Sequence, residues 1–218
     1  METIEFEGKT YQLKLSRCFY ALDQVNGLGV CVSGYDVWLL SGVLMQDRTA
    51  LFCYPGRLLR YLKLGWVNSN GGQLTLSDRG REVIREYLTR YEAAEYAQRE
   101  KRKKTARFRG KVLRALRNDE VEIADVKVSG KEVEVQWEGP VCFSSVWVDE
   151  GYSVSIQSDE ASIIPREGEL WQLLLQRLAE RQKVLSGFAI MKPEVGRLLK
   201  FLRAQYPFTF GLQRKSGT

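Results

Sequence analysis

The fold of this chain depends most on residues 54–81, which read YPGRLLRYLKLGWVNSNGGQLTLSDRGR. Pro55 suits the first turn of a helix, because its missing N–H would find no intrahelical partner there. Leucines at positions 58, 59 and 62 predict a helix with one inward-facing apolar side, and Gly65 is suited to end it. The outward side of this helix is expected to carry Arg57, Arg60, Tyr61 and Lys63.

The rest of the stretch predicts a hairpin and a further helix. Short strands are expected at residues 66–67 and 74–76, separated by the polar turn Asn68-Ser69-Asn70-Gly71-Gly72. Ser77 can cap the helix that follows. No proline and no glycine occurs from Arg81 to Arg109. One helix can therefore continue through these residues, although the sequence leaves open whether residues 78–117 form one helix or two.

Helical spacing also precedes the stretch. It begins at Ser33 and places an apolar stripe at Val37, Leu40, Val43 and Leu44. A second short helical segment is expected at residues 49–52. The order helix, short helix, helix, hairpin, helix over residues 33–91 is that of a winged helix-turn-helix.

The same residues carry a resemblance to a known superfamily. The run from Arg57 to Val67, the polar glycine-containing tip and the run from Leu74 to Arg81 resemble the recognition helix, wing and exit of bacterial winged-helix regulators such as the MarR and PadR families. The resemblance extends more loosely over residues 33–91. It implies DNA binding, although winged helices also serve protein contacts alone, and a fold does not decide a function.

If residues 55–63 form a recognition helix, its polar side enters the major groove, which is wide enough for an α-helix. Arginine can bridge guanine O6 and N7 or bind phosphate, and tyrosine can donate to phosphate. The wing tip offers short polar side chains at Asn68, Ser69 and Asn70 but no basic residue, which departs from many DNA-binding wings. The residues expected to face DNA from the helix are Tyr54, Arg57, Arg60 and Tyr61.

The positive charge is concentrated in one window. Residues 99–117 contain ten basic residues and one acidic residue, so this window has a net charge of +9 and the rest of the chain sums to −3. Such a concentration suits a phosphate backbone, although a basic run can also be a solvated helix face. The residues of the window expected to contact nucleic acid are Lys101, Arg102, Lys103, Lys104, Arg107 and Arg109.

The two ends of the chain predict different structures. Residues 3–15 alternate between apolar and polar side chains and predict a short hairpin, and Ser16 could cap a brief helix that ends at Asn26-Gly27. After residue 118 the period changes to two, which predicts a four-stranded antiparallel meander over residues 121–156. Two helices follow, one around residues 170–178 and one that begins at Pro193.

Together these patterns predict an α+β protein: a winged helix-turn-helix, then a long basic helix, then a four-stranded antiparallel meander with two helices. The expected domains are an N-terminal hairpin embellishment (1–32), the winged helix-turn-helix (33–98), a basic linker helix (99–118) and an α+β domain (119–218).

Composition argues against several classes of function. The chain of 218 residues has no histidine, which removes the commonest general base and nucleophile partner. The four cysteines are far apart in the sequence, with no Cys-x-x-Cys pair for zinc, and no glycine-rich phosphate motif is present. The sequence thus predicts a protein that is not an enzyme and binds no metal or cofactor. It also lacks a membrane-spanning run and a signal peptide, so a cytoplasmic protein is expected.

The favoured hypothesis is a DNA-binding transcription regulator in which the basic helix contacts phosphates and the recognition helix reads bases. Duplex DNA is the expected partner, but the sequence does not exclude single-stranded DNA or RNA. The exit helix is expected to expose Val83, Tyr87 and Tyr91, which favours a homodimer with two recognition helices. The second domain would then serve dimerisation or bind a protein partner.

The alternative is a protein-interaction adaptor or inhibitor, of phage or mobile-element origin, whose winged helix docks on another protein. Residues 6–15, with Ala21-Leu22, look similar to the opening of some small phage tail-assembly proteins.

Overall fold

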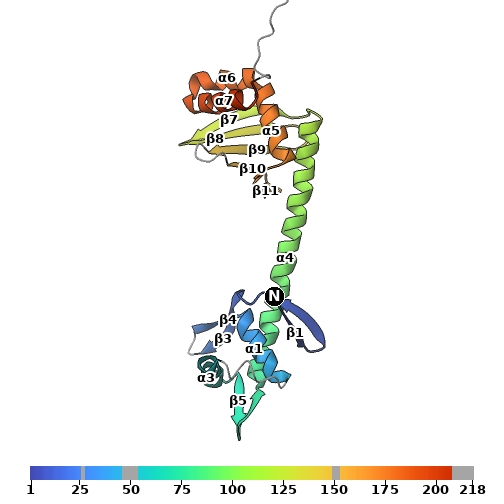
Figure 1. Ribbon diagram of the computed structural model, residues 1–218, viewed down its shortest axis with the longest axis vertical. Coiled ribbons are helices and arrows are strands. Elements are labelled where there is room, and N and C mark those ends of the chain that lie inside the picture. Colours follow the sequence, from blue (N-terminus) through green and yellow to red (C-terminus); the bar gives the residue numbers. More distant parts are fainter. Residues whose placement is uncertain (26–27, 46–53, 149–152, 208–218) are drawn as a thin grey trace, which may run out of the picture. The chain divides into compact units, whose positions relative to one another are not determined.

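The computed structural model describes residues 1–25, 28–45, 54–148 and 153–207, and the side chains of these residues except 20–25 and 28–29. The chain forms two compact units, Met1–Gln98 and Arg99–Thr218, and helix α4 (Asp78–Arg117) supplies residues to both. Helices and small antiparallel sheets make up the structure, so the α+β class is confirmed (Figure 1). No helix among the described residues is long and apolar enough to span a membrane.

The N-terminal unit begins with the expected hairpin. Strands β1 (Glu2–Phe6) and β2 (Lys9–Leu13) pair antiparallel, with Glu2 opposite Leu13. Glu7 and Gly8 connect them with positive φ angles of 49° and 76°. Alternation along the strands places Ile4, Phe6 and Leu13 in the core of this unit.

The brief helix expected after Ser16 is wrong. Residues Cys18–Val25 form strand β3, which pairs antiparallel with β4 (Leu28–Ser33). The Asn26-Gly27 dipeptide was interpreted as a helix end, yet Asn-Gly between two apolar runs is also the strongest short-range signal for a hairpin. Aromatic and β-branched residues in both runs favour the strand.

Helix α1 (Gly34–Leu44) confirms the helical spacing found after Ser33. Ser33 caps its N-terminus: the Ser33 hydroxyl accepts a hydrogen bond from the Asp36 amide, and the Asp36 carboxylate accepts one from the Ser33 amide. This reciprocal pair is a capping box. The helix buries Val37, Leu40 and Val43. The short helix expected at residues 49–52 lies outside the described residues.

The deciding stretch folds in the expected order. Helix α3 (Pro55–Lys63) is followed by β5 (Val67–Asn70) and β6 (Gln73–Leu76), which are joined by Gly71 and Gly72. Both glycines have positive φ, so the turn is at 71–72 and residues 68–70 belong to a strand, not to the turn as expected.

Helix α4 follows after Ser77, whose hydroxyl accepts a hydrogen bond from the Gly80 amide at 3.0 Å. Position 80 requires glycine, because a Cβ atom there would lie 2.2 Å from the carbonyl oxygen of Trp66. Residues 78–117 form one continuous helix.

The apolar surface on which the homodimer was predicted is buried within this unit. Val83, Tyr87 and Tyr91 were expected on the surface, but their exposed fractions are 4%, 2% and 6%. The N-terminal strands explain the difference, because the Tyr91 hydroxyl donates to the Gln12 carbonyl and the Tyr87 hydroxyl to the Arg17 carbonyl. The apolar side of the helix is thus covered by the chain itself.

The C-terminal unit contains an antiparallel sheet in which sequential strands are neighbours, in the order β11-β10-β9-β8-β7 (Figure 1). The sequence analysis expected four strands and missed the two-residue β11. The strands are β7 (Glu122–Ser129), β8 (Glu132–Glu138), β9 (Phe143–Val148), β10 (Val154–Gln157) and β11 (Ser162–Ile163).

Helices complete this unit and pack on the sheet. The two expected helices are α5 (Glu169–Glu180) and α7 (Pro193–Gln205), and α6 (Gln182–Met191) was missed because only Arg181 separates it from α5. Phe108, Val112 and Leu116 from α4 join the same core as the sheet tryptophan Trp137. The C-terminal part of α4 is therefore an integral part of the unit.

Candidate nucleic-acid interface

Helix α3 is tied to α1 through one buried carboxylate, that of Asp36. Arg57 Nη1 lies 2.5 Å from Asp36 Oδ1, and the Tyr61 hydroxyl donates to the same oxygen at 2.7 Å. Arg60 Nη1 is 4.0 Å from this oxygen, and Arg60 Nη2 donates to the Cys31 carbonyl at 2.8 Å. The charged side of α3 is thus partly used to hold the N-terminal unit together.

The environment keeps Asp36 ionised. Burial alone would raise its pKa, but hydrogen bonds from Ser33 and Tyr61 and the charge of Arg57 outweigh burial and lower the pKa of this carboxyl. Burial and the nearby Asp36 charge raise the pKa of Tyr61. A neutral tyrosine therefore donates to a charged carboxylate, which is a strong form of hydrogen bond.

Two expectations for α3 are wrong. Tyr61 was expected to face DNA, but its exposed fraction is 0% and its ring stacks on Trp66 at 5.7 Å between centroids. Leu59 was expected to face inward, but it is 59% exposed. The pattern favours leucine over tyrosine for the core, yet a buried carboxylate gives the tyrosine hydroxyl a partner and reverses this preference.

The outward surface of α3 is only weakly basic. Tyr54 is exposed and Lys63 points to solvent, while the Arg57 guanidinium lies 4.6 Å from the centre of the Tyr35 ring. Leu59 borders a hollow that Val30 and Leu64 also line. Asn68, Ser69 and Asn70 are exposed on β5, so all three side chains expected from the wing are accessible.

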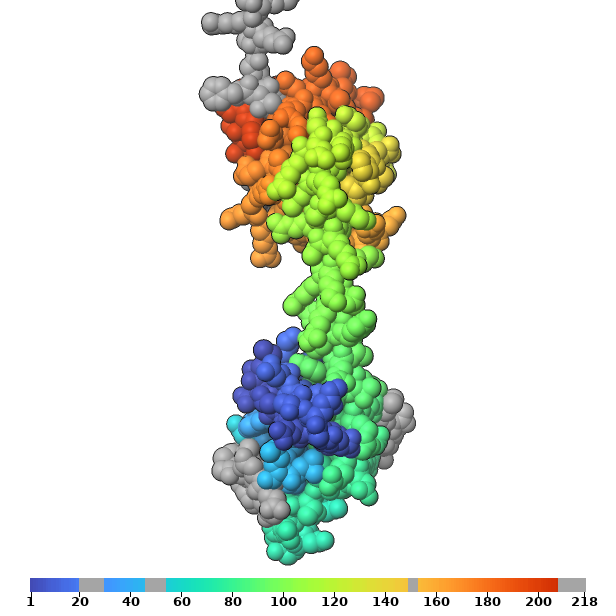
Figure 2. All heavy atoms as spheres, turned by 90° about the vertical axis from the view of Figure 1, so that its right-hand side faces the viewer, coloured from blue at the N-terminus to red at the C-terminus, as the bar shows by residue number. Residues whose placement is uncertain are grey.

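The strongest positive surface lies on residues 99–111 of α4, called here the basic segment. Its eight basic side chains are all exposed, and on the face shown in Figure 2 the side chains of this green part of α4 stand out from the helix. Lys103 pairs with Glu100 at 2.9 Å and Lys111 with Glu160 at 2.8 Å. Within the described parts of the chain, no carboxylate lies within ion-pair distance of Arg99, Lys101, Arg102, Lys104, Arg107 or Arg109.

The basic segment forms one wall of a cleft of about 810 Å³ within the C-terminal unit. Lys101, Lys104 and Lys111 are spaced by three and seven residues, so they share one side of the helix. Arg107 and Lys103 also line the cleft, whereas Arg102 and Arg109 do not. The opposite wall is the connection between β10 and β11, residues 157–162.

This second wall is an ordered turn. The Ser158 amide donates to the Ala161 carbonyl at 3.0 Å, and the Ser158 hydroxyl accepts from the Glu160 amide at 3.1 Å. The Lys111–Glu160 ion pair then joins the turn to α4. Asp159 and Glu160 of this turn are both exposed. Sequence reasoning did not place this turn beside the basic segment, because nothing in the local pattern shows which strand end meets the helix.

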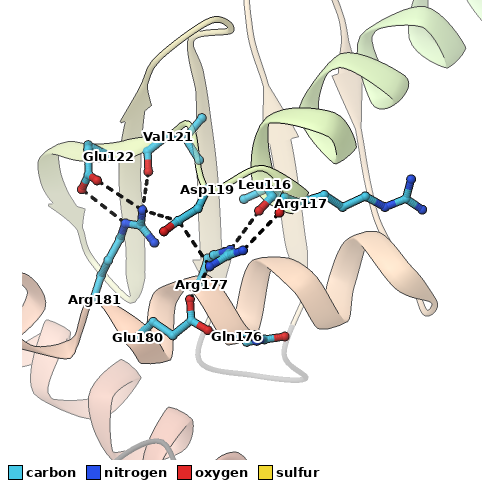
Figure 3. A network of polar contacts seen from close by, with 9 residues as sticks. All are labelled: Leu116, Arg117, Asp119, Val121, Glu122, Gln176, Arg177, Glu180 and Arg181. Carbon is cyan, nitrogen blue, oxygen red and sulfur yellow. Dashed lines mark hydrogen bonds and ion pairs between the residues drawn. The ribbon is translucent and has the colours of Figure 1, made fainter.

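Arg177 binds the C-terminal end of α4, and Arg181 binds the segment that directly follows it (Figure 3). Arg177 Nε donates to the Leu116 carbonyl at 2.8 Å, and Arg181 Nη2 donates to the Val121 carbonyl and to Asp119. The hydrogen bond from Arg181 lowers the pKa of Asp119. Cations at this position satisfy the terminal carbonyls and the negative end of the helix dipole. The network fixes the basic segment relative to the sheet of the same unit.

The cleft is lined by five basic side chains and by the carboxylates of Glu100, Asp159 and Glu160. Exposed guanidinium and ammonium groups line the cleft, and within the described ranges no cluster of three or more Cys, Asp or Glu residues could hold a metal ion. No protein-family model matches this chain, and neither a curated protein nor a solved structure shows significant similarity to it.

Proposed function

We propose that this chain is a DNA-binding protein whose basic segment contacts the phosphate backbone of duplex DNA. The observation that carries the proposal is the set of six exposed cations on residues 99–109 that have no carboxylate within ion-pair distance among the described residues. Arg99 and Arg109 are separated by about 15 Å along the helix, a length of duplex that holds about four phosphates of one strand. The spacing of the cations therefore suits a phosphate backbone.

The proposal includes a winged helix-turn-helix in the N-terminal unit. Support comes from α1, α3, the β5–β6 hairpin and the start of α4, which follow one another in the order expected of that fold. Any base contact from α3 would come from Tyr54 and from the donors of Arg57 and Arg60 that are not bonded within the unit. Tyr61 takes no part. Regulation of transcription follows only from the resemblance to winged-helix regulators.

The first test is a titration of labelled random duplex DNA with the full chain at low and moderate salt. Binding should weaken steeply as salt rises, because each neutralised phosphate releases counterions. The triple variant Lys101→Ala, Lys104→Ala and Arg107→Ala should lower the affinity by roughly 30-fold and reduce the log–log salt slope by about 2 to 3.

A matched control removes the same charge elsewhere in the C-terminal unit. Lys127, Lys183 and Lys200 are exposed and lie outside the cleft, so their triple alanine variant should bind DNA within about twofold of the parent. Equal losses in both triple variants would show an effect of net charge alone and reject the basic segment as the interface. A single strand that binds more tightly than its duplex would reject the duplex part of the proposal.

A second candidate function is protein interaction through α3. It is favoured by Leu59, a large apolar side chain exposed at the centre of the helix beside a hollow lined by Val30 and Leu64. Contiguous exposed apolar surface marks sites of protein interaction. In this case Leu59→Ser should abolish recovery of one stoichiometric partner that resists nuclease treatment, and should leave DNA binding unchanged.

A further inference from the structure

Two exposed cysteines lie together on one face of the β3–β4 strand pair. Cys18 is opposite Ser33 and Cys31 is opposite Tyr20, so the cysteines occupy diagonal positions on adjacent antiparallel strands. Residues two apart on a strand point to the same side, which places both thiols on one face. Both residues are exposed and neither is in a disulfide.

The Cys18 thiol is affected by the neighbouring Cys31, and its Sγ donates to the Ser16 carbonyl at 3.6 Å. Burial raises the pKa of the Cys18 thiol, and the charge and hydrogen bond of the neighbouring Cys31 thiol raise it further. The strand register makes the two residues diagonal neighbours on one face, which agrees with this effect of Cys31 on the pKa of Cys18. No such neighbour is found for Cys142, the other free cysteine among the described residues, which is exposed in the C-terminal unit.

We propose that Cys18 and Cys31 form a reversible intramolecular disulfide, with a small-molecule disulfide such as oxidised glutathione as the oxidant. In the first step, the thiolate of one cysteine attacks a sulfur of the oxidant, forms a mixed disulfide and releases one thiol. In the second step, the other thiolate attacks the protein sulfur of that mixed disulfide and releases the second thiol. The protein loses two protons and two electrons, which are recovered in the two molecules of reduced thiol formed from the oxidant.

The disulfide would link the two strands, β3 and β4, close to the backbone carbonyls that bind α1 and α3. The Cys31 carbonyl accepts the hydrogen bond from Arg60 of α3, and the carbonyl of Arg17, next to Cys18, accepts from the Gly34 amide at 2.8 Å. A covalent link between the strands would therefore stabilise the strand pair to which both helices are attached. The proposal concerns the N-terminal unit and does not depend on DNA binding.

The test uses the full chain with Cys53→Ser, because Cys53 lies outside the described residues. The protein is equilibrated in buffers of reduced and oxidised glutathione, quenched by alkylation and digested. The expected product is a peptide pair joined through Cys18 and Cys31 with a mass lower by two hydrogens, whereas Cys142 should carry only a glutathione adduct. The oxidised form should also unfold at a higher temperature than the reduced form.

The single variant Cys18→Ser distinguishes a disulfide between the two cysteines from independent reaction of two exposed thiols with glutathione. Without its partner, Cys31 should accumulate the mixed disulfide that the parent protein resolves, and circular dichroism should show the same fold as in the parent. The proposal is overturned if Cys18 and Cys31 of the parent carry separate glutathione adducts, or if the amount of adduct on Cys31 is the same with and without Cys18.

Discussion

Helices α3 and α4 both carry clusters of basic side chains, but the structure uses the two clusters differently. On α3, Arg57 contacts the buried Asp36 and Arg60 contacts the Cys31 carbonyl. On α4, Lys101, Lys104 and Arg107 have no carboxylate within ion-pair distance in the described parts of the chain. The same residue types are therefore held by partners within the fold on α3 and are left exposed, with no ion-pair partner among the described residues, on α4.

Asp36 makes the difference between the two helices. An ionised carboxylate that is 2% exposed needs charged or hydrogen-bonding partners, because an unpaired buried charge is strongly unfavourable. Ser33, Tyr61 and Arg57 supply them. The carboxylates that line the cleft beside the basic segment, Glu100, Asp159 and Glu160, are all exposed, and exposed ion pairs contribute little to stability.

The largest effect is expected from Asp36→Asn, which removes the charge that holds α3. The free energy of unfolding should fall by about 3 kcal/mol, because the capping box and the bonds from Arg57 and Tyr61 are lost or weakened together. Urea denaturation followed by circular dichroism measures this. Asp159→Asn, an exposed carboxylate, should change stability by less than about 0.5 kcal/mol. Equal effects of the two substitutions would contradict the assigned role of Asp36.

The same carboxylate predicts how stability depends on pH. The folded protein lowers the pKa of Asp36, so the unfolded chain takes up the proton first as the pH falls. The contribution of Asp36 is therefore complete above the ordinary aspartate pKa and is lost as the pH falls through the folded value. The stability difference between the parent and Asp36→Asn should shrink over this acidic range. A constant difference from neutral to acidic pH would show that the charge of Asp36 is not the cause.

A smaller effect is expected from Arg57→Ala, which tests the α3 side of the comparison. The unfolding free energy should fall by about 1 to 2 kcal/mol, because Asp36 loses one partner but keeps Ser33 and Tyr61. Affinity for random duplex DNA should change by less than about twofold, unlike in the α4 triple variant. Lys63→Ala on the same helix removes the same charge from an exposed position and should leave stability unchanged. A large loss of DNA affinity with unchanged stability would move the phosphate-binding surface to α3.

Local sequence patterns predicted most of the helices and strands. They gave wrong positions for side chains whose partners are distant in the sequence. The apolar stripe after Ser33, the hairpin around Gly71-Gly72 and the unbroken α4 follow from periodicity, turn residues and the lack of helix breakers. Tyr61 could not be placed correctly, because its partner Asp36 is 25 residues away in the sequence.

Only one wall of the candidate site, the basic segment of α4, could be predicted from the sequence. Residue type alone identified the basic segment of α4, since ten cations within nineteen residues form a clear signal. The opposing wall at residues 157–162 and the pairing of Cys18 with Cys31 depend on strand register. Register is set by contacts between strands. The sequence predicted a helix in place of β3 and did not predict β11, so neither contact could be foreseen.

The smallest effect is expected from Glu160→Gln, which sharpens the α4 side of the comparison. This substitution frees Lys111 and removes a negative charge from the cleft wall, so affinity for duplex DNA should rise by about two- to threefold and the salt slope should steepen by up to about 1. Glu169→Gln is the matched control, because it releases Arg117 from an ion pair on the same helix but outside the cleft. Its effect should be smaller. If both substitutions raise affinity equally, the phosphates respond to net charge along α4, and the cleft itself has no special part in binding.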